Sequence, residues 1–111
     1  MPTNEELYDQ AIQLQQEGKM DEAIGRLQEL LEQDAGYALA HAALSVFYGK
    51  LDKLDEAVEH GNKVCELEPN DPFSFVAMSL ICQKAGRLQE AEQALMQARM
   101  AQVAAQQGRS K

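Results

Sequence analysis

The sequence predicts an all-α fold, and three observations lead to that prediction. Good helix formers dominate the composition, whereas Val and Thr are scarce and Trp is absent. The three prolines, Pro2, Pro69 and Pro72, all lie outside the strongly periodic segments. The third observation is an internal repeat of 34 residues, the length of a helix-turn-helix unit that stacks into a solenoid.

The internal repeat is visible in five sets of residues that keep the same spacing. In each repeat an acidic or polar step ends in an alanine, at Ala23, Ala57 and Ala91. Four further sets stay in phase with these alanines: Gly18, Asp52 and Gly86; Met20, Leu54 and Leu88; Leu14, Tyr48 and Cys82; and Leu27, Gly61 and Leu95. The 111 residues therefore divide into repeats of about 4–37, 38–71 and 72–105, followed by a polar C-terminal tail, 106–111.

The first repeat is predicted to contain two helices. The first helix is expected from Asn4 to Glu17, where Thr3 and Glu6 have the spacing of a capping box. A break at Gly18 separates it from a second helix over Met20–Gln33, whose apolar residues recur at helical steps.

The second and third repeats follow the same pattern. Helices are expected over about Ala38–Lys50 and Leu54–Leu67, and then over Pro72–Ala85 and Leu88–Gln106. Asp71 suits the N-cap position before Pro72, because proline is favoured as the first residue of a helix. Gly108 is expected to end the last helix.

These residues resemble those of the tetratricopeptide repeat (TPR) family over residues 4 to about 105. The resemblance rests on the Gly18 and Gly86 turns, on Pro69 at a repeat end, and on small residues at the predicted helix crossings: Ala11, Ser45, Ser79, Ala23, Ala57 and Ala91. It implies three repeats stacked as a short right-handed superhelical solenoid with an extended last helix. The chain departs from the family at Gly61, where a bulky residue usually packs, and at Ala35, which replaces the usual proline.

The composition argues against several classes of function. Asp and Glu total 18 and Lys and Arg total 10, giving a formal net charge of −8. Nucleic acids and anionic membranes bind clustered Lys and Arg, so neither is an expected partner. No apolar run approaches the ~20 residues of a membrane span, and the acidic start has no signal-peptide pattern. Two cysteines are too few for a disulfide framework, so the sequence predicts a cytoplasmic protein.

Catalytic and metal-binding motifs are not found in the sequence. There is no phosphate-binding Gly-rich loop, no G-x-S-x-G motif, and no HExxH or CxxC motif. We therefore expect neither enzyme activity nor a cofactor or metal. His41 is interpreted as a structural histidine and His60 as a surface residue. Cys65 and Cys82 are interpreted as small core residues, with a redox pair or a metal site as the alternative.

The resemblance also indicates a binding surface, because the first helix of each repeat lines the concave side of such a solenoid. It implies partner-binding roles for Tyr8, Ile12, Leu39, Ala42, Val46, Lys50, Phe73, Val76, Leu80 and Lys84. The middle of this groove would be apolar, with charge at its ends. The alternative is that some of these side chains are buried against neighbouring helices. The expected function is that of a non-catalytic interaction module that binds a peptide or an amphipathic helix of another protein.

Some TPR domains grip the C-terminal carboxylate of heat-shock chaperones with a clamp of Lys, Asn and Arg. The equivalent positions in this sequence are Tyr8, Ile12, Ala43, Phe73 and Ala77. None of these residues is Lys, Asn or Arg, so this subtype is not expected.

A second hypothesis is self-association. The net charge is −7 over residues 4–37, −4 over 38–71 and +3 over 72–111, so an acidic head could attract a basic tail. The last helix also carries an apolar stripe with no assigned cover: Met96, Met100, Val103 and Ala104. This stripe would either fold back on the third repeat or lie in the apolar groove of a second molecule, as in a homodimer.

Overall fold

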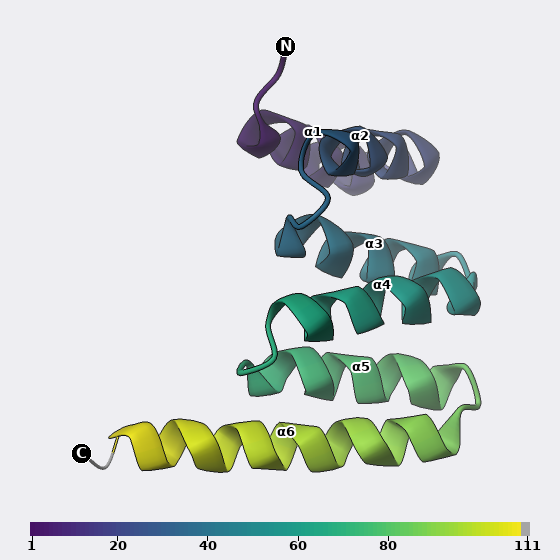
Figure 1. Cartoon of the computed structure of the whole chain (residues 1–111). Helices are drawn as coiled ribbons and strands as arrows, with labels where there is room; N and C mark the ends of the chain where they lie inside the picture. Colours follow the sequence, from purple (N-terminus) through teal and green to yellow (C-terminus); the bar gives the residue numbers. More distant parts are fainter. Residues whose placement is uncertain (110–111) are drawn as a thin grey trace.

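The computed structural model describes residues 1–109, and within them the chain forms six helices and no strand. Successive helices form antiparallel pairs that stack into a solenoid (Figure 1). The bounds of the three pairs are α1 (Asn4–Gln16) with α2 (Met20–Gln33), α3 (Ala38–Lys50) with α4 (Leu54–Leu67), and α5 (Pro72–Lys84) with α6 (Leu88–Arg109). The predicted all-α repeat fold is thereby confirmed.

The predicted helix starts are confirmed by their hydrogen bonds. Thr3 and Glu6 form a complete capping box, in which the Glu6 backbone N–H donates to Thr3 Oγ1 at 3.1 Å and the Thr3 N–H donates to Glu6 Oε1 at 3.3 Å. At the start of α5, the Phe73 N–H donates to Asp71 Oδ1 at 3.0 Å, and Pro72 takes the first turn. Each cap supplies an acceptor to a backbone N–H that has no partner within its own helix.

One predicted helix end is wrong, because α6 continues through Gly108 to Arg109. Gly18 and Gly86 adopt positive φ angles of 83° and 76°, and at both the chain reverses into the second helix of its repeat. Asp52 takes the same place in the second repeat with a φ of 62°. Gly18 and Gly86 thus stand where the chain needs a left-handed residue before the next packed helix, whereas Gly108 lies within α6.

The helix pairs cross at small side chains, as the repeat register predicts. Ala11, Ala23 and Ala57 are fully buried, and the equivalent Ser45, Ser79 and Ala91 are buried too. Ser45 Oγ donates to the Ala57 carbonyl oxygen at 2.8 Å, so its buried hydroxyl is paired across the crossing. Larger side chains fill the space beside the crossings, including the fully buried Leu7, Leu27, Leu30 and Leu44.

A histidine pair within the second repeat joins α3 to α4 and, through the Ala35 carbonyl, to the connection that follows α2. The rings of His41 and His60 meet with their Nδ1 atoms 3.0 Å apart, and His41 Nε2 lies 2.9 Å from the Ala35 carbonyl oxygen. A carbonyl can only accept, so His41 Nε2 carries a proton and its Nδ1 accepts from His60 Nδ1–H. His60 also stacks on Tyr48, whose hydroxyl accepts from Gln28 Nε2 at 3.1 Å.

The structural role predicted for His41 therefore holds, because the ring is buried and both of its nitrogens are paired. The surface position predicted for His60 is wrong, because its ring is half-buried between His41 and Tyr48. The sequence placed the two histidines on different helices but carried no signal for their contact.

The small side chain at the second crossing is required for stability. We expect Ala57→Leu to overpack the crossing and to lower the free energy of unfolding by ~1–3 kcal/mol. Because short solenoids unfold with strong coupling between neighbours, the melting temperature of the whole domain should fall. Circular dichroism measures this fall, and Ala57→Ser is the control that keeps a small side chain. An unchanged melting temperature in Ala57→Leu would contradict the close crossing.

The histidine pair should make stability depend on pH. Burial, together with the neighbouring His41, lowers the pKa of His60 below its ordinary 6.5, although Glu59 opposes the shift. The unfolded chain therefore takes up a proton at His60 more readily than the folded chain does. The stability that this group contributes is complete above pH 6.5 and is lost as the pH falls below it. Urea denaturation at several pH values measures this effect. Below pH 6.5 the free energy of unfolding should fall less in His60→Gln than in the wild type. Equal falls would show that His60 is not the group responsible.

Candidate functional site

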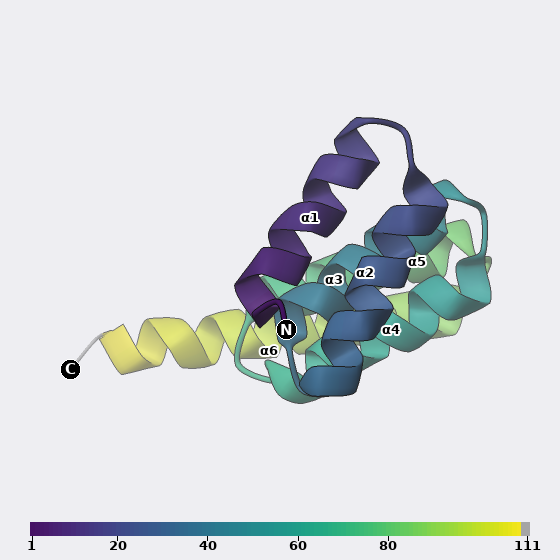
Figure 2. The ribbon, with the colours of Figure 1, turned by 90° about the horizontal axis from the view of Figure 1, so that it is seen from above.

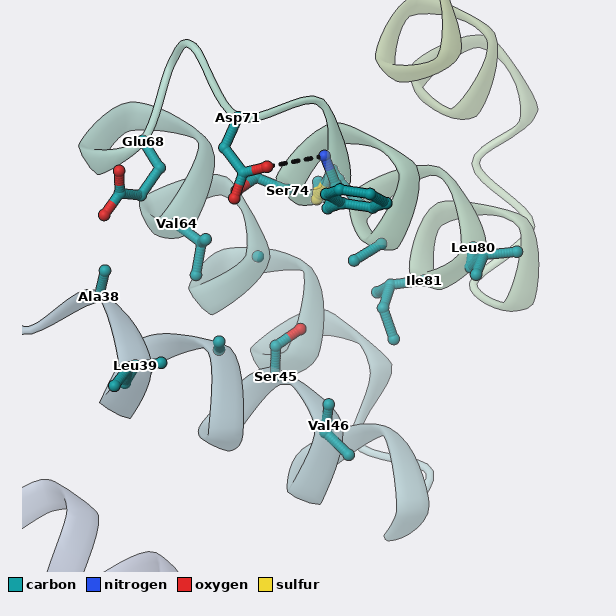
Figure 3. Close-up of a pocket in the computed structure, with 15 residues that line it drawn as sticks. Ala38, Leu39, Ser45, Val46, Val64, Glu68, Asp71, Ser74, Leu80 and Ile81 are labelled. Atoms are coloured by element: carbon teal, nitrogen blue, oxygen red, sulfur yellow. Dashed lines mark hydrogen bonds between the residues drawn. The ribbon is translucent and has the colours of Figure 1, made fainter. Parts of the chain in front are cut away.

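A pocket of about 570 Å³ opens between α3, α4 and α5 (Figure 3). Leu39 and Val46 lie on the α3 side, Leu80 and Ile81 lie on the α5 side, and Val64 of α4 lies between them. The full lining is Ala38, Leu39, Ala42, Ser45, Val46, Gly61, Val64, Glu68, Asp71, Phe73, Ser74, Ala77, Met78, Leu80 and Ile81.

The pocket is a consequence of how the repeats stack. Helices α3 and α5 each pack extensively on α4, so α4 forms the floor of a groove whose walls are the two flanking helices. Gly61 is part of this floor. A Cβ atom at Gly61 would lie 2.9 Å from Met78 Sδ and 3.4 Å from Ser45 Oγ. Met78 therefore occupies the space that a larger side chain at position 61 would fill.

The walls expose large apolar side chains. Leu39 is 56% exposed, Val46 50%, Phe73 78% and Leu80 60%. Core side chains of the same types, such as Leu27 and Leu44, are fully buried. The four wall residues are therefore not buried against neighbouring helices, which was the alternative left open by the sequence.

The other partner-binding residues predicted from the sequence lie in different parts of the structure. Ala42 lines the pocket. Val76 lines a second pocket of about 380 Å³, between α5 and α6. Tyr8 and Ile12 are partly buried against the core of the first two repeats. Lys50 is exposed at the end of α3, and Lys84 Nζ donates to the nearby Gly49 carbonyl oxygen at 2.8 Å.

Sequence reasoning missed the floor and one end of the pocket. Gly61 and Val64 lie on the second helix of a repeat and Glu68 is the C-cap of that helix, whereas the family resemblance assigns the groove to first helices. The signal available was Gly61 itself, a glycine at a helical position where the repeat register predicts a bulky residue.

Negative charge is confined to one end of the pocket. Glu68 and Asp71 are the two charged residues in the lining, and both are acidic. The Asp71 carboxylate is occupied, because its Oδ1 accepts from the Phe73 N–H and its Oδ2 accepts from Ser74 Oγ at 3.4 Å. Glu68 is exposed, so its carboxylate is accessible to a cationic group on a bound partner.

The two cysteine thiols are poorly suited to act as nucleophiles. Cys65 and Cys82 are free thiols. Burial raises the pKa of the Cys65 thiol to about 11, with smaller contributions from Cys82, Asp71 and Glu66. Burial also raises the pKa of Cys82. Because the thiolate is the nucleophile, thiols with raised pKa values react slowly.

Two further findings concern residues 1–109. No three His, Cys, Asp or Glu side chains in this part of the chain come together as a metal site would require. None of the helices in the same range combines the length and the apolar character needed to span a membrane.

The comparisons with known proteins agree with this architecture. Residues 38–71 match the family model described as "Tetratricopeptide repeat". No characterised protein matches the chain by sequence.

Several solved structures share the fold of the chain at low sequence identity. MamA matches with a TM-score of 0.86 at 20% identity, over 95% of this chain and 61% of its own, so this chain spans about three fifths of MamA. The second TPR of Spaghetti (RPAP3), bound to the HSP90 peptide SRMEEVD, matches with a TM-score of 0.79 at 22% identity, over 89% and 92%. The translocator chaperone SycD of Yersinia enterocolitica, in an alternative dimer, gives 0.78 at 22% identity, over 88% and 74%.

The floor of the pocket can be tested with two helical glycines. Gly25 has open space where a Cβ would stand, so Gly25→Ala should raise the free energy of unfolding by about 0.5–1 kcal/mol. Gly61→Ala should lack this gain, because the added Cβ would displace the sulfur of Met78. Urea denaturation of both variants provides the comparison. An equal gain at the two positions would show that Met78 does not pack over Gly61.

Proposed function

Because the chain folds as stacked helix-turn-helix repeats and residues 38–71 match the tetratricopeptide repeat family, we propose that it is a non-catalytic interaction module whose pocket between α3 and α5 binds an apolar segment of another protein. The expected ligand is an amphipathic helix or an extended peptide with bulky apolar anchors.

One observation carries this proposal. Leu39, Val46, Phe73 and Leu80 are each at least half exposed, and all four border the same pocket. Scattered apolar side chains are common on protein surfaces, but a set gathered around one concavity is typical of a binding site. Burying these side chains on a partner would remove apolar surface from water, which is the main favourable term in most associations.

The charge of the pocket narrows the class of ligand. Glu68 and Asp71 would repel an acidic peptide, and the clamp-equivalent positions Tyr8, Ile12, Ala43, Phe73 and Ala77 carry no cationic side chain. The peptide SRMEEVD bound by the second TPR of Spaghetti carries three acidic residues, so we expect a different ligand here. A segment with two apolar anchors and a basic residue facing Glu68 fits the pocket better.

We further propose that the protein works in a reducing compartment such as the cytoplasm. The two cysteines are both free thiols, and structural disulfides form mainly in oxidising compartments.

Peptide selection on the intact protein tests whether the pocket binds an apolar segment. A display library of random peptides should yield binders that contain two bulky apolar residues and a basic residue. Val46→Glu and Leu80→Glu should each remove this binding, because a buried carboxylate has no partner in the pocket.

Both positions are exposed, so helicity and melting temperature should stay close to those of the wild type. Lys63→Glu, a charge change on an exposed residue of α4 outside the pocket, is the matched control and should bind like the wild type. Peptides that bind the Leu80→Glu variant as well as the wild type would place the site elsewhere. A large fall in melting temperature would show that these side chains are part of the core.

A further inference from the structure

The last helix is much longer than its partner. Helix α6 has 22 residues and α5 has 13, so the C-terminal end of α6 projects past the start of α5 by about 13 Å (Figures 1 and 2). We call residues 99–109, which include this projection, the α6 overhang. Met100 and Val103 on the overhang and Met96 just before it are at least half exposed and lie on one helical stripe.

The overhang is opposite in charge to the pocket. After Glu92 the sequence contains no acidic residue, and the charged residues of α6 beyond that point are Arg99 and Arg109. The charged residues of the pocket lining are Glu68 and Asp71. An overhang with an apolar stripe and only positive charges thus matches an apolar pocket whose two charges are negative.

The overhang and the acidic end of the pocket lie at the same edge of the molecule. Phe73, at the start of α5, borders both the pocket between α3 and α5 and the smaller pocket beside α6. On the α6 side the smaller pocket is lined by Leu95 and Ala98 and, on the overhang itself, by Arg99, Gln102, Ala105 and Gln106. A two-fold axis close to Phe73 would therefore bring the overhang of each molecule to the pocket of the other.

We infer that a second copy of this chain occupies the pocket, in a two-fold dimer in which each α6 overhang enters the acidic end of its partner's pocket. The inference rests on the proposed function, because it names an occupant of the same site. An exchange of identical elements closes on itself, which is the symmetry that most small oligomers adopt. The overhang fills only the acidic part of the groove, because α5, which forms one wall, spans about 20 Å.

Light scattering of the full chain from about 1 µM to about 1 mM tests the dimer. The expected result is a rise to twice the mass of one chain. Phe73→Glu in the pocket and Met100→Glu on the overhang should each restore the monomer, because each places a carboxylate in the apolar contact. Both side chains are exposed, so both variants should keep the fold. Gln93→Glu, which adds the same charge to α6 before the overhang, is the control and should dimerise like the wild type.

A mixture of the two monomeric variants gives the sharpest result. The intact overhang of Phe73→Glu can enter the intact pocket of Met100→Glu, so mixing should restore a heterodimer through one of the two contacts. A misfolded variant could not give this rescue. A full chain that is monomeric at all concentrations, or a Phe73→Glu variant that still dimerises, would overturn the inference.

The failure of this inference is distinguishable from the failure of the proposed function. A monomeric full chain whose selected peptides are lost in Leu80→Glu would exclude the second copy but leave the pocket as a site for another protein. A dimer that Phe73→Glu and Leu80→Glu both leave intact would place self-association on another surface.

Discussion

The close crossing of each helix pair is the constraint on which the rest of the structure depends. Ala23, Ala57 and Ala91 carry no side chain beyond Cβ, so each second helix can lie directly against the first. That contact fixes the repeat, and stacking of the repeats then places α3 and α5 on either side of α4. The pocket follows from this stacking and needs no special loop. Gly61 and Met78 adjust its floor, since the methionine takes the space that the glycine leaves.

The sequence predicted the features that depend on local periodicity. The capping box at Thr3, the N-cap at Asp71 and the buried crossing residues all follow from spacing along one chain segment. Contacts between neighbouring helices could not be predicted from spacing along the chain. The pairing of His60 with His41 depends on how α4 lies against α3, and the placement of Val76 beside α6 depends on how α5 turns relative to its neighbours. The extension of α6 past Gly108 could not be predicted from composition, because glycine ends a helix only where the chain reverses.

Charge and shape act on the same surface. In the proposed function, the exposed apolar walls would supply a non-directional driving force for binding, whereas Glu68 and Asp71 would select against acidic ligands and set the end at which a cationic segment is favoured. The α6 overhang has the matching properties within the same chain. A partner protein would have to compete with this overhang, so self-association would set the concentration at which the pocket is open.

The most direct test of the central claim, that the pocket is the binding surface, is a methyl NMR titration of the full chain with a peptide obtained by selection. Binding should shift the methyl signals of Leu39, Val46 and Leu80, which line the pocket, and leave those of the buried Leu7 and Leu27 in the first repeat unchanged. Saturating shifts confined to methyl groups outside the pocket, with Leu39, Val46 and Leu80 unmoved, would contradict the account.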